Sequence, residues 1–503
     1  MIEQLQHALN AGDNHQAQVL IAKISEQQAS PQTQVPLVNL CLKHGFFDLG
    51  VQCFAKAAKD DHIALQLLPL LKEPLLANNP DLAYAFIDAA ISTQADNLSF
   101  ILSVADCLLG QQNLIVVERF LRQILQNSVH NEILARLSEV YFRQNQLHEA
   151  KACAQMALEL SPENPQSYIN LAVLEKALQN LPESARLYSK VLELDENNFF
   201  AHINLAQLCL MSGEFELGWL ENEWRWYDSN CHSESLPLPL WQGQQETDHH
   251  ILIWADQGLG DQIMYLSLLD RLSARFTVKL DPRLMDLLPQ SINHLPIDYS
   301  GDYSEFDSHI SLGSLPRYFV KGFEDFNPKP AFLNVSANGK NTLIDSNKKV
   351  IGFSWRGGSF GTGGGLRSLP LEQWQTLFSQ FPATDYQWLN VQYDSTAEEK
   401  QWLQEHGVET PEIDLKNDLT ALSDVLSQLN YYIGIDNSTV HLAGALGVPS
   451  VLLLTPVADW RWFTEEHYCY WYQSVKLLRA LSSHQQDNPQ WVDQVIECIK
   501  RDV

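Results

Sequence analysis

The feature that most constrains the fold is a repeat in the first half of the chain. From Asn131 onward, large, aromatic and small residues recur about every 34 residues, the period of tetratricopeptide helix pairs. One copy carries Ala150, Ala154 and Ala157 where the second helix must approach the first, and Pro162 ends the unit. Because such pairs bury little apolar surface alone, they must stack into a solenoid with a concave face.

The repeat persists upstream in a weaker form. Segments around Gly12, Gly45 and Gly110 each resemble the turn between the two helices of a pair. We therefore predict six or seven helical repeats over residues 1–228, the early ones degenerate.

Two asparagines suggest a role for the concave face. Asn170 and Asn204 occupy the same place in YINLA and HINLA, whereas the preceding repeat has Arg136 there. A side-chain amide both donates to and accepts from an extended backbone, so this pair predicts a groove for a polypeptide. The alternative is that both are ordinary helix-surface residues on a pure scaffold.

A tryptophan-rich joint, GEFELGWLENEWRWY, follows the repeats. Trp219, Trp224 and Trp226 could form a ligand surface, but packing between domains is the favoured interpretation because aromatic residues dominate buried interfaces. Residues 229–249 are polar and lack periodicity, which predicts a linker.

The second half of the chain changes period. Short apolar strands alternate with helices, which is typical of parallel sheets. The predicted strands are 250–256, 277–280, 297–299, 309–312, 349–355, 387–391, 431–435, 451–454 and 474–478. The predicted helices are 262–275, 371–381, 419–429, 439–446 and 490–501. These elements predict two Rossmann-like lobes facing each other across a cleft, residues 250–345 and residues 346–503.

The segment YYIGIDNSTVHLAGALGVPSVLLLTP, residues 431–456, predicts a strand, a turn, a helix and a second strand. Asp436, Asn437 and Ser438 supply the turn and the helix cap. Unpaired N–H groups and the helix dipole at such a turn favour an anion, and ligands bind at this edge of a doubly wound sheet. A nucleotide phosphate is the predicted anion.

Composition excludes several classes of protein. A net charge of −28 argues against nucleic acid as a partner. The eight cysteines form no C-x-x-C pair, and no His/Cys/Asp cluster has metal-binding spacing, so we expect free thiols and no metal. No apolar run approaches a membrane span, and the first residues lack a basic stretch before an apolar one, so we expect a cytoplasmic protein.

Taken together, QGLGDQIMY, WRGG…LRSLPLEQW, GIDNSTVHLAGALGVP and VADWRWF resemble bacterial proteins that fuse tetratricopeptide repeats to a glycosyltransferase domain. That domain is similar to the lipopolysaccharide heptosyltransferases, and the architecture is similar to that of the peptide O-GlcNAc transferases. The resemblance covers residues 131–478. It implies a tetratricopeptide solenoid followed by a two-lobed GT-B transferase domain.

The resemblance places the catalytic base at Asp261, which follows Gly258-Leu-Gly260 at the end of a strand. A transfer that inverts the anomeric centre needs a base to take the acceptor's proton. The alternative is that Asp261 caps the following helix. Asp256 is the rival carboxylate.

The same resemblance assigns donor binding to the turn after residue 435. Ser438 and Thr439 would hold the donor phosphates, and His441 would donate to a phosphate. Asp436 would bind a ribose or cap the helix. A structural role for His441 is the alternative.

Arg356 and Arg367 flank a glycine-rich loop and are the candidates to stabilise the departing diphosphate. Relatives usually have a basic residue at the position of Arg367. They also have polar or basic residues in the loop, which is GGSFGTGGG here. Gln392, at the end of a predicted strand, is a further donor-site candidate.

These observations predict an inverting, metal-independent glycosyltransferase that uses a nucleotide sugar and modifies a hydroxyl of a polypeptide. Some relatives act on flagellin, so a flagellin or another surface protein is the acceptor that the resemblance implies. Two alternatives remain: a saccharide or lipid-linked acceptor, and a repeat scaffold with a decayed transferase domain. The bare glycine loop favours the last of these.

Overall fold

The computed structural model describes residues 1–26, 31–60, 63, 66–67, 79–94, 97–110, 113–228, 235–335, 344–345, 347–357, 368–455, 458–464, 467–479 and 490–502. Contacts divide the chain into two compact units, Met1–Leu194 and Asp195–Val503. Each unit is described in turn.

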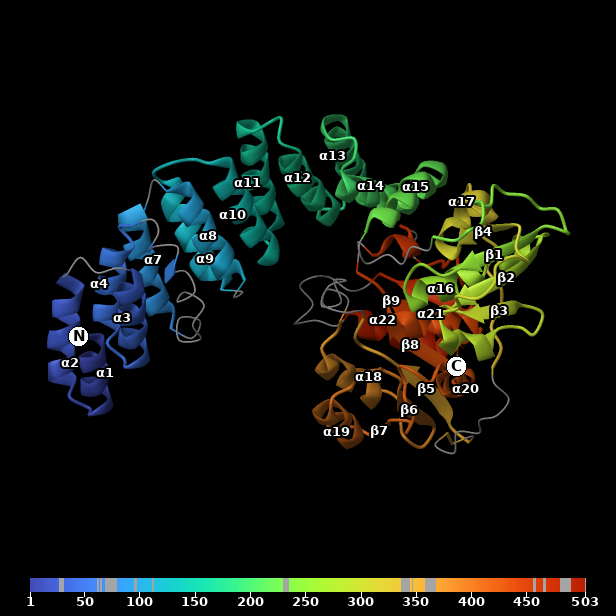
Figure 1. Ribbon diagram of the computed structural model, residues 1–503. Helices are drawn as coiled ribbons and strands as arrows, with labels where there is room; N and C mark the ends of the chain where they lie inside the picture. The colour runs from blue at the N-terminus through green and yellow to red at the C-terminus, as the bar shows by residue number, and fades with distance from the viewer. Residues whose placement is uncertain are drawn as a thin grey trace. The chain divides into compact units, whose positions relative to one another are not determined.

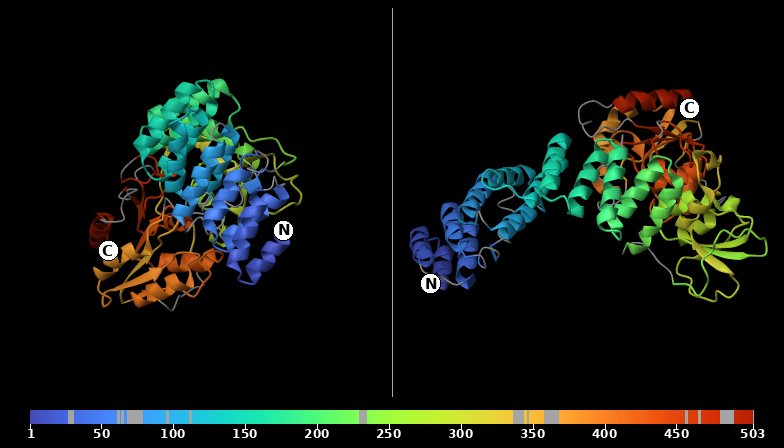
Figure 2. Two further views of the ribbon diagram at one scale, coloured as in Figure 1. Left: turned by 90° about the vertical axis from the view of Figure 1, so that its left-hand side faces the viewer. Right: turned by 90° about the horizontal axis from the view of Figure 1, so that it is seen from above.

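The first unit is built from helix pairs (Figures 1 and 2). Its described helices are α1 (Ile2–Asn10), α2 (Asn14–Glu26), α3 (Pro31–Lys43), α4 (Phe47–Ala57), α7 (Pro80–Gln94), α8 (Leu98–Leu109), α9 (Leu114–Leu125), α10 (Asn131–Arg143), α11 (Leu147–Leu160), α12 (Pro165–Ala177) and α13 (Leu181–Leu194). The predicted small residues let the paired helices approach closely. Ser138 of α10 donates to the Ala150 carbonyl of α11 at 2.8 Å, and Ser184 of α13 donates to the Ala172 carbonyl of α12 at 2.7 Å.

The turn between the two helices also recurs in most of the described pairs. One residue there has a positive φ: 77° at Gly45, 60° at Asn145, 63° at Gln179 and 81° at Gly213. The last three are 34 residues apart, which is the tetratricopeptide period. The predicted repeat is therefore confirmed.

The second unit begins with the last helix pair, α14 (Phe199–Met211) and α15 (Phe215–Asn222), and a 3-10 turn, η2 (Glu223–Tyr227). This pair packs with the α/β part, although the sequence pattern changes only near residue 228. The interpretation of the joint as packing is confirmed. Trp219 is buried, with its ring centre 5.6 Å from that of Trp460, and Trp226 lies 5.4 Å from Trp254.

A four-stranded sheet follows, with neighbours parallel throughout in the order β3-β2-β1-β4. Its elements are β1 (His250–Trp254), α16 (Leu259–Leu266), β2 (Arg275–Leu280), β3 (Asn293–Pro296), β4 (Ser308–Ser311) and α17 (Pro316–Phe319). The helix predicted over 262–275 is wrong in its bounds, because a 3-10 turn, η3 (Leu269–Arg271), replaces its second half. The strand predicted at 297–299 lies at β3 instead.

The described part of the predicted linker, residues 235–249, packs on this sheet. Leu240 pairs in parallel with His309, and the Trp241 amide donates to the His309 carbonyl at 2.9 Å. The Trp241 side chain is buried against Tyr318, with ring centres 4.7 Å apart. The polar composition of the segment predicted a linker, although the Trp241 side chain attaches it to the sheet.

A six-stranded sheet completes the unit, again with neighbours parallel throughout, in the order β10-β9-β8-β5-β6-β7. Its strands are β5 (Lys349–Phe353), β6 (Tyr386–Asn390), β7 (Val408–Glu409), β8 (Tyr431–Ile435), β9 (Ser450–Leu453) and β10 (Val475–Leu478). Its helices are α18 (Gln375–Ser379), α19 (Ala397–Glu405), α20 (Leu419–Ser427), α21 (Ser438–Ala445) and α22 (Gln490–Asp502).

Two of these elements, α19 and β7, were not predicted. Helix α19 is polar, and its sequence signal is the capping box of Thr396 and Glu399 rather than an apolar stripe. The strand predicted at 431–435 and the helix after it are confirmed. Among the described residues, no helix has the length and apolar character needed to cross a bilayer.

Candidate functional site

The site is built where α16, which follows β1, lies against α21, which follows β8 (Figure 1). Gly260 makes this approach possible, because a Cβ added there would come within 2.9 Å of the His441 Cδ2 atom. Gly260, the second glycine of QGLGD, therefore allows α16 and α21, the helices that follow β1 and β8, to lie in contact.

His441 is buried in this contact. Its Nδ1 lies 2.8 Å from the Tyr472 hydroxyl, and its ring stacks on Trp462 with centres 5.1 Å apart. These contacts fit the structural alternative for His441. Its predicted contact with a donor phosphate stays a prediction.

Asp261 does not cap α16, so that alternative is wrong. Gly258 is the N-cap residue, and no side chain caps the helix. The Asp261 Oδ1 atom accepts from Arg461 instead, at 2.6 Å from Nε and 2.5 Å from Nη2. Arg461 lies in η10 (Trp460–Trp462), after β9, so the ion pair joins the two sheets.

Burial and charge act on this pair in opposite directions. Burial raises the pKa of Asp261 above its ordinary value, and the Arg461 guanidinium opposes that rise. Burial also disfavours the charge on Arg461, but Asp261 and Asp459 outweigh it and hold the Arg461 pKa well above its usual value. The Asp261 side chain remains 15% exposed.

Asp256, the rival carboxylate, forms an ion pair with Arg225 of the tryptophan-rich joint. Its Oδ2 accepts from Arg225 Nε at 2.8 Å, and its Oδ1 accepts from the Gly313 amide at 3.1 Å. Arg225 Nη2 also donates to the hydroxyls of Ser311 and Ser314, each at 2.7 Å. The Asp256 side chain is 1% exposed, so this network anchors η2 to the four-stranded sheet.

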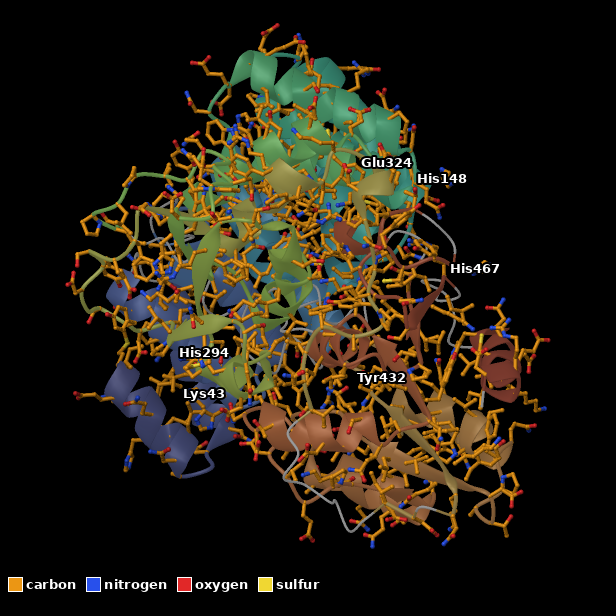
Figure 3. All side chains as sticks on the ribbon, turned by 90° about the vertical axis from the view of Figure 1, so that its right-hand side faces the viewer. Lys43, His148, His294, Glu324, Tyr432 and His467 are labelled. Carbon is orange, nitrogen blue, oxygen red and sulfur yellow. The ribbon has the colours of Figure 1, made fainter. Side chains whose placement is uncertain are left out.

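The turn after β8 differs from the predicted anion site. Asn437 caps α21 and accepts from the amides of Thr439 at 3.0 Å and Val440 at 3.2 Å. It also donates to the Ser354 hydroxyl at 2.9 Å, and that hydroxyl lies 2.7 Å from the hydroxyl of Tyr432. Tyr432 is labelled in Figure 3. The Asn437 side chain therefore accepts from two backbone amides that were predicted to bind the anion. This corrects the prediction of an anion site at the start of α21.

Ser438 and Thr439 instead line a pocket of ≈ 160 Å³ between α16 and α20–α21. Its walls are mostly apolar and come from helices and loops that follow strands of both sheets. They are formed by Leu259, Ile263, Arg283, Tyr393, Leu415, Lys416, Leu419, Leu422, Ser438, Thr439 and Leu442. Asp436 is buried beside this turn, and its carbonyl would lie 2.4 Å from a Cβ added to Gly357.

Arg356 and Gln392 lie at the base of the glycine-rich loop. Arg356 pairs with Glu399 and donates to the Asp394 carbonyl at 2.7 Å. Gln392 is buried and accepts from the amides of Trp355 at 3.0 Å and Arg356 at 2.8 Å. Neither residue lines the pocket, so both shape the start of the loop. Arg367 and residues 358–366 of the loop lie outside the described residues.

The two asparagines belong to different units. In the first unit, Asn170 accepts from Gln166 on its own helix at 2.8 Å. In the second, Asn204 donates to the Phe200 carbonyl on its own helix at 2.8 Å. Arg136, in the preceding repeat, pairs with Asp106 at 3.0 Å. Both asparagines are half-buried, and their role in peptide binding stays a prediction.

Sequence analysis missed Arg461 and Arg225 as partners of the two aspartates. Arg461 stands in the VADWRWF motif, which was its only signal, because its partner lies 200 residues away. Within the described ranges, no three His, Cys, Asp or Glu side chains come together in a way that could hold a metal ion.

Comparison with known proteins gives limited similarity. No family model matches the chain. Protein FlbA of Caulobacter vibrioides is 26% identical over an alignment of 361 residues, and the match covers 64% of this chain. The chain spans 59% of the length of that relative.

Several solved structures also match part of the chain. MamA is 14% identical with a TM-score of 0.26, over 29% of this chain and 89% of that one. YrrB, described as a TPR protein with an unusual peptide-binding site, is 14% identical with a TM-score of 0.26, over 33% and 84%. PilF of Pseudomonas aeruginosa is 14% identical with a TM-score of 0.27, over 38% and 88%.

Proposed function

We propose that the second unit is a two-lobed glycosyltransferase of the GT-B type that uses a nucleotide sugar. The observation that carries the proposal is the pocket between α16 and α20–α21. Helices and loops that follow strands of both parallel sheets line it. Two of these helices, α16 and α21, follow β1 and β8, and the carboxyl ends of parallel strands are where α/β proteins bind ligands. Its apolar walls suit a nucleoside, and the hydroxyls of Ser438 and Thr439 suit the attached phosphates.

The proposed reaction is a single displacement. The acceptor hydroxyl attacks the anomeric carbon and the bond to the nucleoside diphosphate breaks, while Asp261 takes the acceptor's proton. Arg367, through the family resemblance, would neutralise the charge on the departing diphosphate. The result is an inverted sugar linkage.

Proton transfer to Asp261 gives the reaction a pH dependence. The base must be ionised, and burial raises the pKa of Asp261. The rate should therefore fall on acidification, with its midpoint above the ordinary aspartate value of about 3.9. A rate profile that stays flat down to pH 4 would argue against Asp261 as the base.

The proposed acceptor is a polypeptide hydroxyl in the cytoplasm, and the repeats are proposed to bind the polypeptide, with Asn170 and Asn204 as candidate contacts. The family resemblance suggests a flagellin or another surface protein. One observation favours the non-catalytic scaffold as a second candidate: Asp261 and Arg356, two predicted active groups, are both engaged in ion pairs.

Donor binding separates these candidates. Calorimetry with a panel of nucleotide diphosphate sugars, followed by a hydrolysis assay, should find one donor that binds and is slowly hydrolysed. Asp261→Asn should keep the binding and lose the hydrolysis, whereas Thr439→Val should weaken the binding. No binding by any donor would favour the scaffold. Binding and transfer to a glycan, but not to protein, would favour a saccharide acceptor.

A further inference from the structure

Arg461 holds the candidate base by a specific geometry. Its Nε and Nη2 atoms converge on a single oxygen of Asp261, Oδ1. Its Nη1 donates to Asp459 Oδ1 at 2.6 Å. No donor within the part of the chain that the structure describes bonds to Asp261 Oδ2. The carboxylate is therefore fixed in rotation, with one oxygen held and the other available.

Arg461 is itself held on several sides. Its guanidinium lies 4.7 Å from the centre of the Trp460 ring, and that ring meets Trp219 of α15 edge-on. The Trp471 indole donates to the Arg461 carbonyl at 2.9 Å. A charged side chain locked in this way can fix the position of a reacting group, which a solvated one cannot do.

The groups around the pair act on the base in both directions. Burial raises the pKa of Asp261, the Arg461 guanidinium lowers it, and the carboxylates of Asp459 and Asp256 raise it again. Besides Asp261 and Asp459, the ionisable groups acting on Arg461 are those of Tyr265 and Asp436. Arg461 therefore sits between carboxylates from both sheets, and it supplies the positive charge that opposes the effect of burial on Asp261.

We propose that Arg461 is a positioning residue that orients Asp261, so that Oδ2 receives the proton of the acceptor hydroxyl. This inference rests on the proposed transfer reaction. Arg461 touches neither the donor nor the acceptor in this account. It acts only through the carboxylate.

The variants Arg461→Gln and Arg461→Lys test the proposal, with Arg275→Gln as the matched control. Arg275 begins β2, and both members of its ion pair with Glu305 are exposed. We expect Arg461→Gln to lower kcat on the order of 10²-fold with donor Kd unchanged, because misplacement of a catalytic group costs about that much. Its acid limb should move to higher pH. Arg461→Lys should restore the acid limb but only part of kcat, and the control should match wild type.

A second readout does not depend on transfer. Carbon-13 NMR titration of the aspartate carboxyls, with Asp261 assigned from the Asp261→Asn spectrum, measures the ionisation of Asp261 directly. Its midpoint should rise in Arg461→Gln and return toward wild type in Arg461→Lys. An unchanged titration in both variants would overturn the proposal, even if the enzyme is active. A wild type that titrates as expected but transfers no sugar would instead overturn the proposed function.

Discussion

Two arginine–aspartate pairs follow the same strand and differ in their access to solvent. Asp256 and Asp261 both come after β1, and each meets an arginine from a distant segment. The side chains of Arg225 and Asp256 are 8% and 1% exposed, and both oxygens of Asp256 are bonded. Those of Arg461 and Asp261 are 19% and 15% exposed, and among the described residues only one oxygen of Asp261 accepts a hydrogen bond.

The difference in exposure suits the two pairs to different roles. A buried pair contributes little net stability while complete, but the loss of one member leaves a costly unpaired charge. A partly solvated pair can lose or gain a proton at much lower cost. Asp256 is therefore suited to anchor the joint, and Asp261 to exchange a proton with a substrate.

The largest expected effect is on the structural pair. Arg225→Ala should lower the free energy of unfolding of the second unit by about 3–5 kcal/mol, because Asp256 is left buried without its partner. Urea denaturation measures the change. Arg275→Ala is the control. Its ion pair with Glu305 is exposed on the surface, so its loss should lower the free energy of unfolding by at most about 1 kcal/mol. Equal losses of unfolding free energy in the two variants would show that the Arg225–Asp256 pair is no more important for stability than a surface ion pair.

A smaller effect is expected at the contact between α16 and α21. Gly260→Ala should cost about 1–3 kcal/mol, because the new methyl group overlaps the His441 ring. Thermal unfolding measures the loss. Gly110→Ala is the control, since the nearest atoms to its added Cβ lie 3.5 Å away. If both variants melt alike, the close approach of the helices is incorrect.

Asp261→Asn should change the free energy of unfolding by only about 1 kcal/mol or less, because the pair is partly solvated and the amide oxygen can still accept from Arg461. The same denaturation experiment applies. A loss as large as that of Arg225→Ala would make Asp261 structural.

The smallest effect is expected at Tyr265, one turn after Asp261. Its buried hydroxyl has no hydrogen-bond partner among the described residues. Tyr265→Phe should therefore leave the free energy of unfolding within about 0.5 kcal/mol of wild type. A clear destabilisation in calorimetry would indicate an ordered water bonded to the hydroxyl.

The sequence predicted elements whose signal is local and missed contacts that are not. The 34-residue repeat and the segment from β8 to β9 have strong patterns, so their existence followed from periodicity. Helix α19 is too polar to show such a pattern, and Trp241 is a single anchor in a polar stretch. The Asp261–Arg461 pair spans 200 residues, a separation that no local pattern reveals.

The predicted site residues are only partly brought together. Ser438 and Thr439 line the pocket, whereas Asp261 lies on α16 and pairs with Arg461 outside the pocket lining, and the roles of all three stay predictions. The prediction of an anion site at α21 is partly wrong because the side chain of Asn437, predicted only as part of the helix cap, accepts from two of the amides assigned to the ligand. Side-chain competition of this kind depends on rotamers that a sequence does not specify.

The central claim is that Asp261 serves sugar transfer to a protein. Its most direct test is the intact mass of a flagellin, or another surface protein from the same organism, after co-expression with the chain. We predict that wild type adds the mass of whole sugar residues, and that Asp261→Asn, at equal yield and with an unchanged melting temperature, adds none. Equal sugar addition with both chains, or none with either across the candidate acceptors, would contradict the account.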